Sequence, residues 1–311
     1  MKALPLAIGL AVTLGACAVQ KAQSTVVGPP SRDLMAQFWV EPGRNRDLYW
    51  GPWGERNAPR PDVLYKLDGI DSGGFSRKWD VKDESGREWS VKMGPEAQSE
   101  VTTSRILWGV GYHQPPNYYL EKWKVDNGKQ VANGSPGRFR PSLKELDQAG
   151  DWSWSENPFA DTLQHRGLLV LLVMLNSADL KDNNNSVYDL PRPMEGARRW
   201  FVVRDVGSSL GETGWGPQRN DIDQFEKRGF ITGVEDGFLR FDVSGRFSGF
   251  LQEQLRPEDA RWICQRLQRL TPRQWRDAFR AGGYDDAATE RYIRKIREKI
   301  AQGLAVSRGV S

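Results

Sequence analysis

The chain has 311 residues, with 44 basic and 40 acidic side chains and a net charge of +4. So small an excess of positive charge, without long Lys/Arg runs, argues against nucleic-acid binding. The length allows a substantial hydrophobic core, arranged as one large domain or as two lobes.

The first residues have the pattern of an export signal. Lys2 precedes an apolar run over residues 3–14. This run is too short to span a membrane, which takes roughly 20 residues, but it suits the h-region of a signal peptide. The residues before Cys17 resemble the lipobox of bacterial lipoproteins, in which the cysteine is acylated and becomes the mature N-terminus. We therefore expect a signal peptide over residues 1–16 and lipidation of Cys17, the alternative being an ordinary signal with a chance cysteine.

Ala18, rather than aspartate, follows the cysteine, as in lipoproteins sent to an outer membrane. The resemblance implies a lipid-anchored protein of the cell envelope, on the periplasmic face of the outer membrane. Residues 17–33 are predicted to be the lipidated cysteine and a tether. Once Cys17 is lipidated, Cys264 is the only remaining thiol, so no intrachain disulfide is expected, and we interpret Cys264 as part of a helix core.

Three β-rich segments follow, at residues 63–70, 75–83 and 87–93. Turn sequences containing Gly73-Gly74 and Gly86 separate them, which predicts an antiparallel meander. Gly94-Pro95 suits the start of a helix over residues 97–110, and a further strand is predicted at 117–125. Residues 126–165 have little regular pattern and are predicted to form a connector or an insertion.

An apolar run at residues 168–175 leads into a polar loop. The run is apolar on every face, which predicts a helix that is buried all round. The carboxylate, ammonium and amide groups that follow, over residues 179–185, have no use inside a core. A polar loop placed by a rigid helix is a candidate active site.

The rest of the chain is predicted to be first β-rich and then helical. Strands are expected at 186–190 and 198–206 and within 229–250, followed by helices at 257–270, after Thr271 and after Asp285. Most of the thirteen tryptophans are expected to pack in the core. His113 and His165 are interpreted as structural, and without a Cys/His cluster no zinc site is expected.

Four features now stand in order: a glycine turn between strands, a strand lysine followed by a helix acid, the polar loop, and a strand that ends in Asp205. This order resembles the protein-kinase fold, over about residues 63–211. The kinase catalytic loop D-L-K-x-x-N matches, residue for residue, Asp179-Leu180-Lys181-Asp182-Asn183-Asn184, and the D-F-G motif matches Asp205-Val206-Gly207 with valine for phenylalanine. The turn with Gly73 and Gly74 takes the place of the glycine-rich loop.

The resemblance implies binding of ATP with Mg²⁺ or Mn²⁺. Lys92 would hold the α and β phosphates, oriented by Glu100 or alternatively by Glu96. Backbone amides at Gly73 and Gly74 would approach the phosphates. The remaining roles are those of the loop and of the strand end: Asp179 would accept the proton of the acceptor hydroxyl, Lys181 would neutralise charge on the γ phosphate, and Asn184 and Asp205 would be metal ligands.

The sequence also departs from the common kinase pattern. Ser177 and Ala178 stand where histidine and arginine precede the aspartate, and the glycine turn lacks a full G-x-G-x-x-G. Such simplified loops are similar to atypical branches, including HipA-like kinases, spore-coat CotH kinases and the secreted casein-kinase family. Taken singly, each site residue has a plain alternative, such as a solvated strand lysine for Lys92 or a strand-end cap for Asp205.

We therefore predict an α+β, two-lobed, kinase-like fold, with an antiparallel-sheet N-lobe over residues 34–125 and a helical C-lobe over 126–311. The predicted function is transfer of a phosphoryl or nucleotidyl group from ATP to a hydroxyl of a protein or small molecule. One alternative is a pseudokinase that binds an envelope partner. Another is a non-enzymatic lipoprotein that binds glycan or protein through Trp50, Trp53, Trp152 and Trp154.

Overall fold

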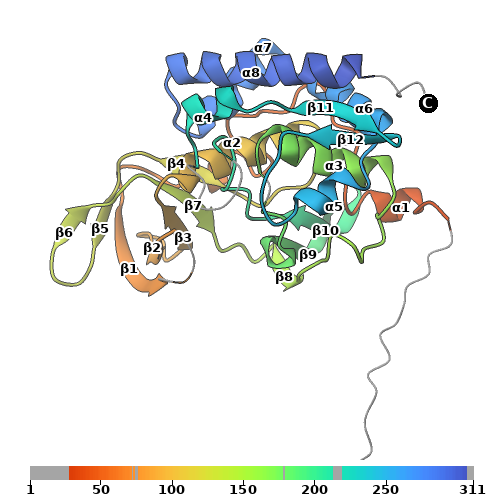
Figure 1. Ribbon diagram of the computed structural model, residues 1–311. Coiled ribbons are helices and arrows are strands. Elements are labelled where there is room, and N and C mark those ends of the chain that lie inside the picture. Colours follow the sequence, from red (N-terminus) through yellow and green to blue (C-terminus); the bar gives the residue numbers. More distant parts are fainter. Residues whose placement is uncertain (1–27, 72, 74–75, 178, 213–218, 307–311) are drawn as a thin grey trace, which may run out of the picture.

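The structure is a computed structural model, and it describes residues 28–306 except for 72, 74–75, 178 and 213–218 (Figure 1). The predicted signal peptide, the lipidation site Cys17 and the loop residue Gly74 lie outside the described residues. Among the helices of the described ranges, none is both long and apolar enough to cross a membrane.

A seven-stranded sheet forms the N-terminal part, in the order β4-β7-β3-β2-β1-β5-β6. Every pair is antiparallel except β1 with β5, which is parallel. The predicted meander is confirmed as the three central strands. The strands run β1 (Leu64–Asp71), β2 (Lys78–Lys82), β3 (Glu88–Met93), β4 (Tyr118–Leu120), β5 (Lys124–Asp126), β6 (Val131–Asn133) and β7 (Gly137–Pro141).

The prediction of one strand over residues 117–125 is wrong, because the chain bends there and forms β4 and β5. β4 pairs with β7, whereas β5 pairs with β1 on the other side of the sheet. In a flat sheet these two strands would lie about 24 Å apart, at about 4.8 Å per strand. The short link from β4 to β5 reaches at most about 14 Å. The sheet must therefore be strongly curled.

The prediction of a connector over residues 126–165 is also wrong, since this segment supplies β7, an interior strand of the sheet between β4 and β3. Phe139 of β7 points into the core beneath the sheet, and the arginines on either side of it point to the opposite face. Two charged residues in a five-residue strand hide its apolar alternation. Their positive charges face the buried carboxylate of Glu100, which needs cations around it.

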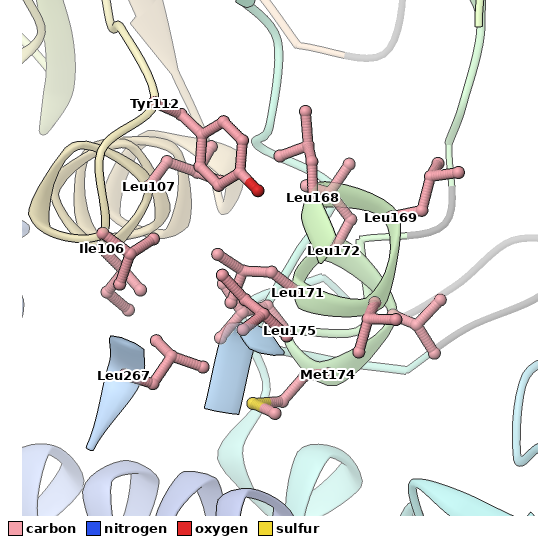
Figure 2. Packing of buried hydrophobic residues seen from close by; sticks show 14 of the residues in the cluster. Ile106, Leu107, Tyr112, Leu168, Leu169, Leu171, Leu172, Met174, Leu175 and Leu267 are labelled. Atoms are coloured by element: carbon pink, nitrogen blue, oxygen red, sulfur yellow. The ribbon is translucent and has the colours of Figure 1, made fainter. Parts of the chain in front are cut away.

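Helix α2 (Glu96–Gly109) follows β3 and packs against β7 and against α7 (Pro272–Ala281). The predicted buried helix is α3 (Leu163–Met174), the centre of the helical part, which packs on α6 (Pro257–Leu267). Figure 2 shows Leu168, Leu171 and Leu175 facing Ile106 and Leu107 of α2. Helix α8 (Asp286–Ala305) runs along one side of this part (Figure 1).

The predicted N-terminal starts of the last two helices are confirmed. Thr271 and Gln274 form a capping box at the start of α7, and the Asp285 side chain caps α8. Cys264 is fully buried in α6, and burial raises the pKa of its thiol to about 12. It is therefore a core residue, as predicted.

Smaller elements complete the structure. The predicted hairpins are β9 (Asn185–Met194) with β10 (Ala197–Val203), and β11 (Ile231–Glu235) with β12 (Phe238–Phe241); β8 (Asp147–Gly150) joins β9. Two separate hydrophobic clusters lie under the large sheet and within the helical part. The α+β fold with an antiparallel-rich sheet and a helical C-terminal part is confirmed. The short helices are α1 (Arg32–Met35), α4 (Ile222–Lys227), α5 (Ser248–Gln252) and two 3₁₀ turns (Glu55–Asn57 and Asp182–Asn184).

Candidate functional site

Lys92 is the centre of the candidate site. Its side chain is 2% exposed, and Nζ donates to Glu100 Oε2 at 2.8 Å and to Asp205 Oδ1 at 2.9 Å. Nζ also lies 3.0 Å from Glu96 Oε2. The structure thus brings together one residue of β3, two of α2 and one from the segment after β10. Both candidate helix acids contact the lysine, so the sequence alternatives Glu96 and Glu100 are both partners.

The local fold explains this convergence. Alternation along β3 places Val91 in the cluster under the sheet and Lys92 on the opposite face. Gly94, with a φ of 98°, makes the left-handed turn that leads from β3 into α2. Glu96 and Glu100 are four residues apart on α2 and therefore project from the same face of the helix.

Glu100 is completely buried and balances three cations. Its Oε2 accepts from Lys92, while Oε1 lies 3.0 Å from Arg138 Nε and 2.8 Å from Arg140 Nη2. Burial by itself raises the pKa of Glu100, but Arg138 and Lys92 more than offset this, so its pKa lies below the usual range. The carboxylate is therefore ionised and fixes the direction of the Lys92 ammonium.

Sequence reasoning missed Arg138 and Arg140. Both lie on β7, and Arg138 stands directly opposite Lys92 in the sheet register. Burial lowers the pKa of Arg140 to about 10, but its guanidinium stays charged at neutral pH. The alternation Arg-Phe-Arg at residues 138–140 was the available signal. Arginines that are buried on one face of a strand need an opposite charge facing them, and α2 supplies that charge in Glu100.

Asp205 is the third partner of Lys92. Its Oδ1 also accepts from the Gly207 amide at 3.3 Å, and the side chain is 40% exposed. Burial tends to raise the pKa of Asp205, but the Lys92 ammonium holds that pKa well below its usual range. Asp205 is therefore an ionised carboxylate that faces both Lys92 and solvent.

Gly207 fits this site because it has no side chain. A Cβ at this position would lie 2.8 Å from Glu96 Cβ and 3.2 Å from Lys92 Nζ. Val206, which replaces the usual phenylalanine, is fully buried. The Asp-Val-Gly sequence therefore packs as a tight turn against α2.

The predicted catalytic loop is held by its own side chains. Lys181 Nζ lies 2.9 Å from Asp179 Oδ2, and Asn184 Nδ2 donates to the Asp179 carbonyl at 2.7 Å. The backbone amides of Arg204 and Asp205 donate to the Asn184 carbonyl at 2.8 and 3.0 Å. These bonds place the loop beside Asp205 and fix the Asn184 side chain through its nitrogen. None of the described residues donates a hydrogen bond to Asn184 Oδ1.

Asn184 and Asp205 have the chemistry of a magnesium site. A carboxylate and an amide oxygen are ligands that Mg²⁺ prefers, and this ion usually takes its other ligands from phosphate and water. The described residues contain no group of three or more His, Cys, Asp or Glu side chains that could hold a metal. One or two protein oxygens are the usual share of a magnesium ion that is bound together with phosphates.

The glycine turn is less directly connected to the site. The Gly73 amide donates to Asp71 Oδ1 at 2.8 Å, so it is already engaged within the turn. Ser76, just after the turn, donates its hydroxyl to Glu96 Oε2 at 2.6 Å and so ties the segment before β2 to α2. The phosphate-binding role of Gly73 stays a prediction.

A cavity of 2010 Å³ lies elsewhere, between residues 28–41, the loop 155–164 and the β9–β10 turn. No predicted site residue lines it, and we place the chemistry at Lys92 because the charged groups converge there. His113 and His165 are buried, the first between the Ala36 carbonyl and Glu195. Burial lowers the pKa of His165 to about 4. Both histidines are structural, as predicted.

Comparison with known proteins adds a distant likeness to a solved structure. No family model matches the chain, and a search of curated proteins finds no match. Among solved structures, the chain is similar to a Helicobacter pylori proinflammatory kinase, CtkA, with a TM-score of 0.45 and 11% identity over 79% of this chain and 100% of that chain. The kinase-like fold is recognised here from the order of its elements and from the contacts of Lys92.

Proposed function

We propose that this kinase-like protein binds ATP with Mg²⁺ or Mn²⁺ at the Lys92 site and transfers a phosphoryl group to a hydroxyl of a protein or small molecule. The observation that carries the proposal is the placement of Lys92 Nζ between Glu100 and Asp205, at 2.8 and 2.9 Å. A buried ammonium, oriented by a helix acid and beside an aspartate that would hold the metal, is the arrangement that protein kinases use for phosphoryl transfer.

Each residue has a role that its contacts support. Lys92 binds the α and β phosphates, and Asp205 and Asn184 hold the metal that neutralises the phosphate charge. Asp179 accepts the proton of the acceptor hydroxyl as the new P–O bond forms and the bond to the leaving ADP breaks. Lys181, 2.9 Å from Asp179, is placed to neutralise charge on the transferred group.

Nucleotidyl transfer is the alternative reaction at the same site, since the same residues bind the triphosphate. A pseudokinase is the alternative without catalysis. The binding surface predicted from tryptophans is not favoured, because Trp53, Trp152 and Trp154 are each less than a tenth exposed and belong to the hydrophobic clusters. An envelope location through lipidated Cys17 is part of the proposal and rests on the sequence pattern.

Product analysis tests this function without knowledge of the acceptor. Water replaces the acceptor slowly in many kinases, so we expect ADP from the wild-type chain with ATP and Mg²⁺, and much less from Asp179→Asn. AMP and pyrophosphate would instead indicate nucleotidyl transfer. Bound ATP with no product above the Asp179→Asn level would favour the pseudokinase, and absence of binding would refute the proposed site.

A further inference from the structure

A second charged network surrounds Glu96, one turn before Glu100 on α2. Glu96 is 5% exposed and uses both oxygens. Oε2 accepts the Ser76 hydroxyl at 2.6 Å and lies 3.0 Å from Lys92 Nζ, while Oε1 accepts from Arg219. Glu96 therefore connects the lysine to the end of the segment that follows Asp205.

Described residues on both sides of positions 213–218 are bonded to α2. Before these positions, Ser99 Oγ donates to the Gly207 carbonyl at 2.6 Å. After them, Asn220 Nδ2 donates to Gln98 Oε1 at 3.0 Å, and Tyr284 contacts Asn220 from the loop before α8. Because neighbouring positions of one helix hold residues on both sides, the place of Arg219 beside Glu96 is set by the fold.

The two helix acids differ in how their charge is balanced. Glu100 has two arginines of β7 in addition to Lys92, so it does not depend on the lysine for neutralisation. Glu96 has two cations within ion-pair distance among the described residues, Lys92 and Arg219. The charge of Glu96 is therefore shared between Arg219 and Lys92, with the Ser76 hydroxyl as a neutral hydrogen-bond donor to Oε2.

We propose that Glu96 and Arg219 are positioning residues for Lys92: Arg219 takes up the charge of Glu96 and so leaves the Lys92 ammonium available to a phosphate. Without Arg219, Glu96 would draw Lys92 toward α2 and would repel an incoming polyanion. The inference rests on the proposed function, since it assumes that Lys92 binds phosphate. It adds that Arg219 acts on the lysine through Glu96.

Three variants and a control test the inference by ATP affinity in the presence of Mg²⁺. We expect Arg219→Gln to raise the Kd for ATP on the order of tenfold. The double variant with Glu96→Gln should regain most of that loss, because the uncompensated charge is gone, and Arg219→Lys should bind almost as wild type. If Arg219 only supported the fold, Glu96→Gln would not restore the affinity, because the second substitution would add its own loss of stability.

The matched control is the Arg240–Glu235 pair between β11 and β12, at 2.7 Å, and Arg240→Gln should leave the Kd unchanged. Urea midpoints of all variants separate a loss of affinity from unfolding. An unchanged Kd in Arg219→Gln, or a loss that Glu96→Gln does not rescue, overturns the inference and leaves the proposed function standing. A wild-type chain that binds no nucleotide overturns both.

Discussion

Replacing Glu100 by glutamine tests the electrostatic account of the site. The substitution keeps the volume and removes the charge, so no cavity forms. It leaves Arg138 and Arg140, which lie 3.0 and 2.8 Å from the carboxylate, without their buried anion. Removing one partner of a buried ion pair costs about 3–5 kcal/mol, because the remaining charge stays desolvated. Lys92 retains Glu96 and Asp205, so the cost falls mainly on the two arginines.

Urea unfolding followed by circular dichroism measures this cost, provided that the m value is unchanged. The control is Glu88→Gln on the same strand as Lys92. Glu88 lies 3.4 Å from Lys82, its side chain is 61% exposed, and such surface pairs contribute about 0–1 kcal/mol. A Glu100→Gln shift no larger than that of Glu88→Gln would refute the reasoning, because it would show that the carboxylate does not neutralise the buried cations.

Three further predictions concern other parts of the chain. Gly207→Ala should cost about 1–3 kcal/mol in urea unfolding and weaken ATP binding, since its Cβ would lie 2.8 Å from Glu96 Cβ; wild-type stability and affinity would contradict this. Burial lowers the pKa of Lys299 to about 7, whereas a lysine in the unfolded chain has a pKa of about 10.4. Between these values the unfolded chain binds one more proton, so stability should rise with pH, and Lys299→Met should flatten that rise; parallel pH curves would exclude it. Cys17→Ser should move the protein from the membrane fraction to the soluble fraction, and unchanged fractionation would argue against the lipid anchor.

Most residues of the candidate site could be predicted from the sequence. They either stand close together in the chain or lie next to a segment with a clear helical or strand pattern. Asp179, Lys181 and Asn184 stand within six residues, after an apolar run that is helical in the structure as predicted. Lys92 lies within a clear alternating strand. The meander, the β9–β10 hairpin and the caps at Thr271 and Asp285 were predictable for the same reason: local residue types decide them.

What could not be predicted depends on partners distant in the chain. The segment at 117–125 splits because β7 and β1 offer separate pairing sites, and neither site is visible within the segment. β7 was missed because its arginines are explained only by Glu100, across the fold. Arg219 lies 123 residues from Glu96, so no spacing rule connects them. The choice between Glu96 and Glu100 could not be made because both belong to the same face of α2.

Thermal unfolding of the protein, titrated with ATP and either Mg²⁺ or Mn²⁺, tests the central claim most directly. A ligand that binds only the folded state raises the melting temperature, by the equivalent of about 2.7 kcal/mol at a hundred times its Kd. We predict that ATP raises the melting temperature of the wild-type chain only when the metal is present. Asp205→Asn should melt at the same temperature with and without ATP, whereas Asp80→Asn, on the exposed face of β2, should be stabilised as the wild type is. If no nucleotide shifts the wild-type melting temperature with either metal, Lys92 and Asp205 do not form a nucleotide site.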